Sequence, residues 1–373
     1  MPHENANIEP ERIRKRLSRL PALERVLEAA GEVPIYLVGG AVRDLLLGRA
    51  RTDLDIAVEG DAAEVGRRLG GEVLAHERFA TATVVLDGLE LDLATTRTET
   101  YPRPGALPDV RPATLAEDLA RRDFTVNAMA LPLAGDPELI DPHGGAGDLA
   151  QGVLRVLHER SFVDDPTRAL RAARYAARYR FALDPDTDRL LRDADLDTVS
   201  RDRTDAELRK LAAEPRTRRG FELLDEWGLV VLERGALELI DAVSALAASA
   251  TWRRFVRRGD AVLAAALGRG LQRARELAAA RPARPSEAVE LARGEDAVTL
   301  VLARGLGAEW LDRYVAEWRH VRLEITGDDL LAAGIPEGPA IGRGLAAALR
   351  AKLDDEVDGR EQELMIALDA ARN

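Results

Sequence analysis

The chain has no cysteine among its 373 residues. Disulfide bonds and cysteine-ligated zinc sites are therefore excluded, and the absence agrees with a reducing cytoplasm. No apolar run approaches the roughly 18 residues of a membrane-spanning helix. The first residues, MPHENANIEPERIRKRL, are too polar and charged for a signal peptide. We therefore expect a cytoplasmic protein with no membrane partner, and no protein partner is indicated.

Lysine is also scarce. Only three lysines occur, so nearly all positive charge is carried by arginine, and the formal net charge is −12. A negative balance of this size argues against a protein that coats nucleic acid by bulk electrostatics, although it allows a local basic groove. The length is sufficient for two or more domains with a sizeable core, and no internal repeat is present.

The stretch that organises the chain is IYLVGGAVRDLLLGRARTDLDIAV, residues 35–58. It begins with an apolar run of strand length that ends at two glycines, and a helix-like segment and a polar turn follow. The next segment, Asp53 to Val58, is typical of a strand. Because side chains alternate along a strand, Asp53 and Asp55 share one face while Leu54 and Ile56 share the other.

This arrangement suits a metal ion and a phosphate. Adjacent carboxylates repel each other, and Mg²⁺ relieves the repulsion because it binds carboxylate oxygens and keeps coordination sites for substrate phosphates. Gly39 and Gly40 lack Cβ, so a phosphate can approach their backbone N–H groups, and Arg43 can donate to the same phosphates. Taken alone, a Gly-Gly pair is usually a tight turn and an Asp-x-Asp pair a solvated strand edge.

The same reasoning assigns the remaining elements of the first half. Strands are expected at Ile35–Val38, Asp53–Val58, Thr81–Leu86 and Leu89–Leu93, with a tight Asp87-Gly88 turn between the last two. Residues 1–30 and 62–69 are expected to be helices. From about Leu154 strand signals vanish, and alanine, leucine and arginine recur at helical spacing. A mixed or antiparallel sheet followed by an all-helical remainder is therefore predicted.

The wording LVGGAVRDLLLG followed by DLDIAV resembles the bacterial tRNA nucleotidyltransferase and poly(A) polymerase family, the class II CCA-adding enzymes of the DNA polymerase β superfamily. The resemblance is dense over residues 35–215 and returns near 320–360. It implies an α+β fold: a polymerase-β-like head followed by an all-α neck, body and tail. The implied domains are a head with an N-terminal helix (1–153), a nucleobase-recognising neck (154–215), a body (216–285) and a tRNA-binding tail (286–373).

Two further segments of the head take their meaning from the resemblance. Asp92 lies on the polar face of its expected strand and is the candidate third catalytic carboxylate beside Asp53 and Asp55; its alternative role is an exposed polar position. Residues 98–119 hold four prolines and a glycine and are expected to form a long loop. In the family a flexible loop at this place is required for adding the terminal A, and the alternative is a solvated linker.

A second motif, RRDFTVNAMA at residues 121–130, matches the family almost letter for letter. Asp123 can accept a hydrogen bond from a ribose hydroxyl, which RNA and its nucleotides carry at the 2′ position. Arg122 can donate to a phosphate or hold that aspartate. Asn127 is a candidate nucleotide-binding residue or a turn residue, and Phe124 and Met129 are expected in the core.

A third motif, DDPTRALRAARYAAR at residues 164–178, begins a helix at its proline. Its arginines recur at three- and four-residue steps and therefore line one face, where a triphosphate or tRNA backbone would balance them. The alternatives are a solvated face or pairing with acidic neighbours. The candidate nucleotide-binding arginines are Arg168, Arg171 and Arg174. The family has Glu-Asp where this chain has Asp164-Asp165.

Asp165 and Arg168 match the family positions that select the base. Cytosine and adenine each present an amino donor beside a ring-nitrogen acceptor, and guanine and uracil reverse this pattern. A carboxylate beside a guanidinium therefore favours C and A, since a mismatched edge leaves buried polar groups unpaired. The competing interpretation is that Asp165 only caps its own helix.

The resemblance implies template-independent, Mg²⁺-dependent transfer of CMP, AMP or both from CTP and ATP to the 3′ end of tRNA. Full CCA addition and A-only addition both remain open. One alternative is a bacterial poly(A) polymerase, and another is a catalytically inactive RNA-binding homologue. Two further groups of arginines, Arg216, Arg218 and Arg219, and Arg253, Arg254, Arg257 and Arg258, are expected either to contact tRNA phosphates or to be solvated.

Overall fold

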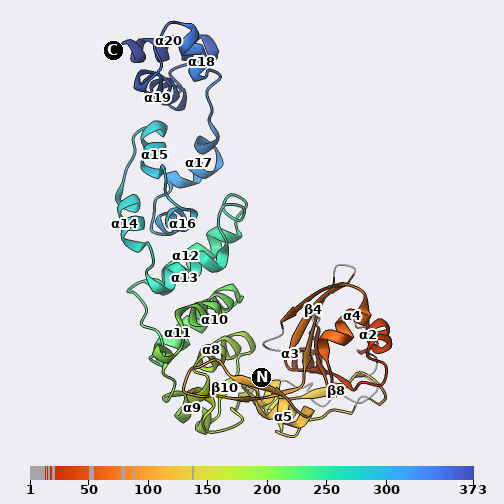
Figure 1. Ribbon diagram of the computed structural model, residues 1–373. Helices are drawn as coiled ribbons and strands as arrows, with labels where there is room; N and C mark the ends of the chain where they lie inside the picture. The colour runs from red at the N-terminus through yellow and green to blue at the C-terminus, as the bar shows by residue number, and fades with distance from the viewer. Residues whose placement is uncertain are drawn as a thin grey trace. The chain divides into compact units, whose positions relative to one another are not determined.

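The computed structural model of the chain describes residues 22–49, 54–76, 80–86, 89–136 and 138–373, with Ile13, Lys15, Leu17 and Ser18 before them. The chain divides into two compact units, residues 1–230 and 231–373 (Figure 1). In the described part of the chain, no helix combines the length and the apolar character that crossing a bilayer requires.

A six-stranded sheet forms the centre of the first unit, in the order β3-β4-β5-β2-β1-β8. The pair β2–β5 is parallel and the other four pairs are antiparallel, so the predicted mixed sheet is confirmed. The bounds are β1 Ile35–Val38, β2 Leu54–Val58, β3 Glu72–His76, β4 Thr81–Leu86, β5 Leu89–Thr95 and β8 Ala130–Pro132.

Helices α2 (Leu23–Ala30), α3 (Gly40–Leu46) and α4 (Ala62–Leu69) accompany the sheet. Helix α4 packs closely on β4 and β5, because Gly66 has no side chain: a Cβ there would lie 3.2 Å from a methyl group of Val84. Val84, Leu91 and Leu93 are fully buried beneath it. The alternation predicted for this part of the sequence therefore produces the core of the head.

Several boundaries differ from those predicted. The single helix expected over residues 1–30 is wrong: α2 begins only after Ala22, whose φ of 59° is left-handed and ends any continuous helix there. Strand β5 extends two residues further than expected, to Thr95. The register of β4 and β5, with Leu86 opposite Leu89, confirms their antiparallel pairing. The Asp87-Gly88 turn and Asp53 lie outside the described residues.

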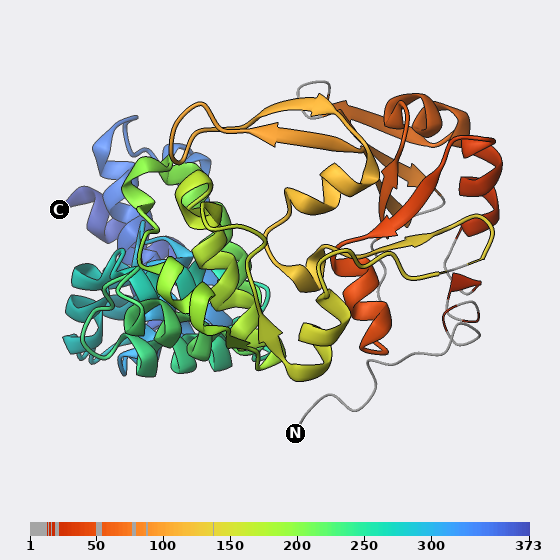
Figure 2. The same ribbon diagram turned by 90° about the horizontal axis from the view of Figure 1, so that it is seen from below.

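The expected long loop is a structured segment. Strands β6 (Arg97–Thr100) and β7 (Asp109–Pro112) pair antiparallel as a separate ribbon, and helix α5 (Leu115–Ala120) follows with a capping box between Thr114 and Glu117. The loop prediction is therefore wrong over more than half of its length. Pro102, Pro104 and Pro108 lie in the irregular turn between the two strands, and only Pro112 lies in a strand, where an edge position tolerates it. In Figure 2 the orange ribbon runs from the sheet to the green helices.

The rest of the first unit is mainly helical. Strands β9 (Val153–Leu154) and β10 (Ala182–Leu183) form a short parallel pair, so the expectation that strands end at Leu154 is wrong at this point. Helix α8 packs against α10 and α11. The helices are α6 Gly145–Gln151, α7 Ser161–Asp164, α8 Thr167–Tyr179, α9 Pro185–Leu191, α10 Arg201–Ala213 and α11 Thr217–Glu226, with short 3-10 turns η2 at Thr125–Asn127 and η3 at Leu196–Thr198.

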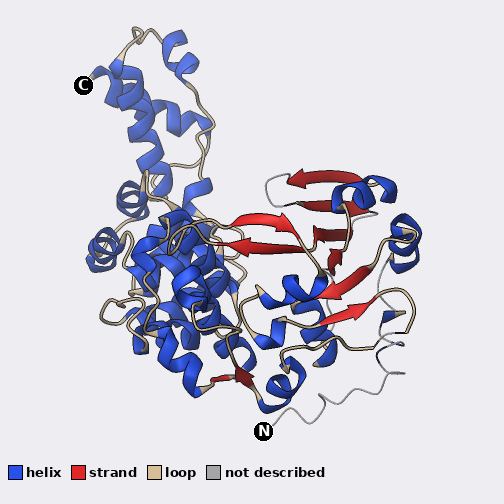
Figure 3. Cartoon of the chain, turned by 60° about the horizontal axis from the view of Figure 1, so that its bottom comes forward, coloured by secondary structure: helices blue, strands red, loops and turns tan. Residues whose placement is uncertain are grey.

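The described residues of the second unit form helices only, as predicted, and every strand, red in Figure 3, belongs to the first unit. One core cluster lies beneath α18–α20 and includes Ile325, Leu330 and Ala367. The predicted division into head, neck, body and tail stays a prediction. The helices are α12 Ala236–Ala248, α13 Arg258–Leu267, α14 Leu271–Ala279, α15 Pro285–Ala292, α16 Ala297–Gly305, α17 Trp310–Ala316, α18 Gly327–Ala332, α19 Pro339–Leu353 and α20 Arg360–Arg372, with the 3-10 turn η4 at Trp318–His320.

Candidate active site

A pocket of about 440 Å³ lies within the first unit, between the open face of the sheet and helix α8. It brings together every predicted site residue that the structure describes, from four separate segments of the chain. Asp53 lies outside the described residues. The predicted residues that line the pocket are Gly39, Gly40, Arg43, Asp55, Asp92, Arg122, Asp123, Asn127, Asp165, Arg168, Arg171 and Arg174.

Two carboxylates come from neighbouring parallel strands. Asp55 on β2 and Asp92 on β5 are partners in the register of the pair, so their side chains lie on the same face of the sheet. The Thr83 hydroxyl on β4 donates to Oδ1 of Asp92 at 2.8 Å and orients that carboxylate. The other face is apolar, as predicted, with Leu91 and Leu93 buried.

This donor set fits a hard divalent cation. Carboxylate oxygens are the ligands that Mg²⁺ prefers, and two such groups leave coordination sites for water and phosphate. Within the described residues no cluster of three or more acidic, histidine or cysteine ligands is present. The predicted carboxylate set also contains Asp53, which lies outside those residues.

The Gly39–Gly40 turn lies against the side chain of Arg122. Gly39 has a left-handed φ of 66°, and a Cβ at this position would lie 2.7 Å from Nη1 of Arg122. Glycine therefore allows both the turn and the close approach of the guanidinium. Arg122 forms its ion pair with Asp118 at 2.7 Å. The predicted alternative in which Arg122 holds Asp123 is therefore wrong.

Asp123 is held instead by Arg171, 48 residues further along the chain. Nε of Arg171 donates to Oδ2 of Asp123 at 2.8 Å, and the Asn127 amide and the Phe124 backbone N–H donate to Oδ1 at 2.9 and 2.8 Å. Burial alone would raise the pKa of Asp123, but the Arg171 guanidinium and these hydrogen bonds lower it to about 2. Asp123 is therefore ionised at neutral pH, and both its oxygens have protein partners.

Arg43 is buried rather than directed to an open phosphate site. Its side chain is 2% exposed, and each of its three guanidinium nitrogens donates to a protein group. The acceptors are the Asp44 carboxylate at 3.0 Å, the Asn127 amide oxygen at 2.5 Å and the Tyr179 hydroxyl at 2.6 Å. These contacts do not support the predicted donation from Arg43 to the phosphates.

The α8 arginines face acidic partners on and after α10, one of the predicted alternatives. Arg171 and Arg174 lie 3.6 and 3.5 Å from carboxylate oxygens of Glu207, and Arg178 lies 3.2 Å from Glu214. These ion pairs do not satisfy every donor of the arginines. Nε of Arg174 is buried and has no hydrogen-bond partner among the described residues. A buried, unsatisfied donor in a pocket is costly unless a ligand accepts from it.

Asp165 makes the contacts of a helix cap. Its Oδ1 accepts from the Thr167 backbone N–H at 3.1 Å, from the Thr167 hydroxyl at 2.6 Å and from Nη2 of Arg203 at 2.9 Å. Arg168 donates to the Ser161 hydroxyl and to the Arg121 carbonyl, both at 2.8 Å. Both side chains line the pocket, so capping and base selection can coexist, because these three Asp165 contacts all fall on one oxygen.

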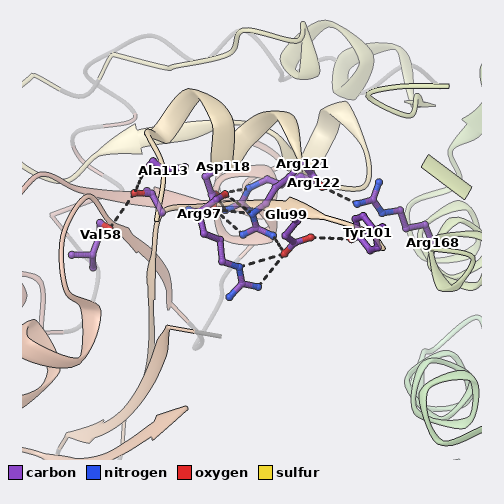
Figure 4. Close-up of polar contacts among 10 residues, drawn as sticks. Val58, Arg97, Glu99, Tyr101, Ala113, Asp118, Arg121, Arg122 and Arg168 are labelled. Atoms are coloured by element: carbon purple, nitrogen blue, oxygen red, sulfur yellow. Dashed lines mark hydrogen bonds and ion pairs between the residues drawn. The ribbon is translucent and has the colours of Figure 1, made fainter. Parts of the chain in front are cut away.

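A network at the base of the ribbon also lines the pocket and was not assigned from the sequence (Figure 4). Arg121 pairs with Glu99 at 2.6 Å and with Asp118 at 2.7 Å, and the Tyr101 hydroxyl donates to Glu99 at 2.9 Å. Burial, with the nearby Glu99 carboxylate, raises the pKa of Tyr101. One feature of the sequence pointed to Glu99 and Tyr101: both lie in a segment bounded by two of the motifs. Their hydrogen-bond partners could be identified only from the structure.

The chain is similar to several known proteins. Residues 35–155 match the family model described as the poly A polymerase head domain. The chain is 38% identical to a CC-adding tRNA nucleotidyltransferase of Deinococcus radiodurans over 334 residues, which cover 85% of this chain and 84% of that protein. It is 33% identical to an A-adding tRNA nucleotidyltransferase of Geobacter sulfurreducens, over 90% of this chain and 45% of that protein.

One solved structure is similar to this chain over nearly its whole length. The complex of a CCA-adding enzyme with ATP superposes with a TM-score of 0.77 at 28% identity, covering 96% of this chain and 97% of that one. The chain spans 45% or less of the length of the A-adding relatives that it matches.

Proposed function

The chain belongs to the family of tRNA nucleotidyltransferases, and we propose that it transfers CMP, AMP or both from CTP and ATP to the 3′ end of tRNA, with release of pyrophosphate. The observation that carries the proposal is the pocket itself. A register-paired carboxylate couple, Asp55 and Asp92, faces the same space as the arginines of α8. A carboxylate pair that can hold a metal, opposite a basic surface that can hold a nucleotide, is the arrangement that nucleotidyl transfer requires.

Asp55 and Asp92, together with Asp53, would hold Mg²⁺. When bound, the metal supplies Lewis-acid polarisation of the attacking 3′-hydroxyl and neutralises charge on the departing pyrophosphate. Asp92, oriented by Thr83, is the candidate acceptor for the hydroxyl proton. The identification as Mg²⁺ rests on the all-oxygen donor set.

Donors at the glycine turn suit a triphosphate. The backbone of the Gly39–Gly40 turn and the Arg122 guanidinium beside it are the proposed phosphate contacts. The lining contains seven arginines, but most of them pair with carboxylates, among them Glu207 and Glu214 outside the lining, and the unpaired Nε of Arg174 is the proposed donor to the nucleoside. Asp165 and Arg168 are the proposed base-reading pair, at the start of the same helix that carries Arg174.

Incorporation on three tRNAs tests the proposal. The substrates end before the first C, after C and after CC, and each is incubated with Mg²⁺ and either CTP or ATP. C incorporation on the first two tRNAs together with A incorporation on the third identifies full CCA addition, C incorporation without A incorporation identifies CC addition, and A incorporation on the third tRNA alone identifies A-only addition. A long A tail on a generic RNA supports a poly(A) polymerase instead, and the absence of any incorporation contradicts the proposal.

A further inference from the structure

The hydroxyl of Tyr179 closes a buried polar triangle with two residues of the first sequence motif. It donates to Oδ1 of Asp44 at 2.8 Å and accepts from Nη2 of Arg43 at 2.6 Å, while Nε of Arg43 donates to the same Asp44 oxygen at 3.0 Å. All three side chains are at most 2% exposed. Such a group is held rigidly, because a broken contact would leave a buried charge without a partner.

The triangle joins two elements that carry different parts of the site. Helix α3 begins at Gly40, directly after the glycine turn, and contains Arg43 and Asp44. Helix α8 begins beside Asp165 and Arg168 and ends at Tyr179. The turn and the base-reading pair are therefore each rigidly linked to one side of the triangle, through a single short helix in each case.

Two further observations support a role of Tyr179 in joining the two helices. The guanidinium of Arg43 lies 4.4 Å from the Tyr179 ring centroid and 5.1 Å from that of Tyr175, so both rings of α8 stack on it. Burial, with the nearby Asp44 carboxylate, raises the pKa of Tyr179 to about 12. The phenol is therefore protonated at neutral pH and can donate to Asp44 while it accepts from Arg43.

Arg43 connects the polar triangle to the residues that line the pocket. Nη1 donates to the Asn127 amide oxygen at 2.5 Å, the Asn127 amide donates to Asp123 at 2.9 Å, and Asp123 holds Arg171 at 2.8 Å. Arg171 in turn donates to the Tyr175 hydroxyl at 2.9 Å. The hydrogen-bonded circuit thus returns to α8, one turn before Tyr179.

We propose that the Tyr179 hydroxyl is a positioning group that fixes the spacing between the phosphate-binding glycine turn and the base-reading pair, with Arg43 acting through it and touching no phosphate. This inference rests on the proposed function, because it assigns the two halves of one nucleotide to the two helices. A nucleotide that must contact both halves gains affinity from the fixed spacing, whereas a ligand that occupies the phosphate half alone gains nothing.

The test compares ligands that span both halves with one that does not. Tyr179→Phe removes the hydroxyl and keeps the ring that stacks on Arg43. Dissociation constants for CTP, ATP and inorganic triphosphate are measured by titration calorimetry with Mg²⁺, without tRNA. We expect CTP and ATP to bind roughly three- to tenfold more weakly, because a smaller fraction of the protein has the correct spacing. Triphosphate is expected to bind within about twofold of wild type.

The matched control is Tyr36→Phe. It also removes one tyrosine hydroxyl, which donates to Glu59 at 3.0 Å, but both of these residues belong to the head. It is expected to change none of the three constants. Thermal unfolding of both variants confirms that each is folded during the titrations.

Two results would overturn the inference. Unchanged CTP and ATP binding by Tyr179→Phe would reduce the hydroxyl to a packing contact. Equal weakening of triphosphate and the nucleotides would show that it acts on the glycine turn alone. Transfer to tRNA is assayed separately: failed transfer with intact nucleotide binding would contradict the proposed function and leave this inference standing.

Discussion

Individual charges in the pocket are set by partners far away in sequence. Asp123 is buried at the pocket wall, yet it is ionised because Arg171 and Asn127 donate to its carboxylate. The carboxylate and Arg171 neutralise each other, so neither is available as an unpaired charge to a nucleotide. The capacity of the pocket to bind a nucleotide is therefore carried by groups with incomplete partners, such as Nε of Arg174.

The substitution Asp165→Asn separates a cap from a base-reading residue. The amide oxygen can still accept from the Thr167 backbone N–H, so a pure cap tolerates the change. If the carboxylate reads the base, the amide can also donate, and discrimination against UTP and GTP falls by about 10- to 100-fold, corresponding to ~1–3 kcal/mol. The measurement is incorporation of each of the four nucleotides on tRNA ending in C or CC.

Asp184→Asn is the matched control. Asp184 caps α9 through the Asp186 and Thr187 backbone N–H groups and pairs with Arg155, as Asp165 pairs with Arg203, but it does not line the pocket. Its substitution is expected to leave base preference unchanged. An unchanged preference for C and A in Asp165→Asn as well would restrict Asp165 to capping.

Which residues meet in the pocket could be predicted from the sequence, because three motifs carry most of them. The hydrogen-bond partners of these residues could not be predicted from the sequence. The steps of three and four along α8 place its arginines on one face, but the pairing of Arg171 with Asp123 depends on how α8 packs against the head. Arg43 was predicted to bind phosphate because it is charged and follows a glycine turn; its burial by two tyrosines depends on tertiary contacts 136 residues away.

At the scale of elements, the ribbon formed by β6 and β7 is anchored at both ends. Its base carries the Glu99–Arg121 pair, and its turn docks on η3 and α10, where Nη1 of Arg203 donates to the Gly105 carbonyl at 2.7 Å. The prolines in this segment indicated a loop, and three of them do lie in the turn between the strands. The prediction missed that the short segments on either side of this turn pair with each other, because side-chain packing decides whether such short segments form strands.

The ribbon turn has no room for a side chain. Gly105 has a left-handed φ of 68°, and a Cβ would lie 2.6 Å from the carbonyl oxygen of Thr198. We expect Gly105→Ala to destabilise the first unit by about 2–4 kcal/mol, the sum of left-handed strain and a steric clash. Thermal or denaturant unfolding measures the change.

Gly135→Ala provides the comparison. Gly135 has a similar φ of 77°, and among the described residues no group beyond its chain neighbours lies within 4 Å of the point that its Cβ would occupy, so the substitution mainly introduces backbone strain. We expect a loss of about 1–2 kcal/mol. Equal losses for the two variants would show that the ribbon turn can leave η3 and α10 without cost.

At the scale of the whole molecule, the α+β head and the helical remainder were both predictable. Alternating apolar residues mark the strands of the head, and the second unit has helical periodicity throughout. The sequence did not reveal that the compact division falls near residue 230, because helices on either side have the same composition. Two of the arginines proposed for tRNA contact, Arg218 and Arg219, pair with acidic residues of their own helix, the solvated alternative.

The central claim is that paired carboxylates on β2 and β5 support metal-dependent nucleotidyl transfer in this pocket. Asp55→Asn keeps the size of the side chain and removes its charge, and Arg201→Ala on the exposed face of α10 serves as the control. The measurement is Mg²⁺-dependent incorporation of CMP and AMP into tRNA by the wild type and both variants. We predict incorporation by the wild type and the control, and a loss of at least about 1,000-fold in Asp55→Asn, equivalent to ~4 kcal/mol of transition-state stabilisation. Turnover of Asp55→Asn within tenfold of the wild type would contradict the account.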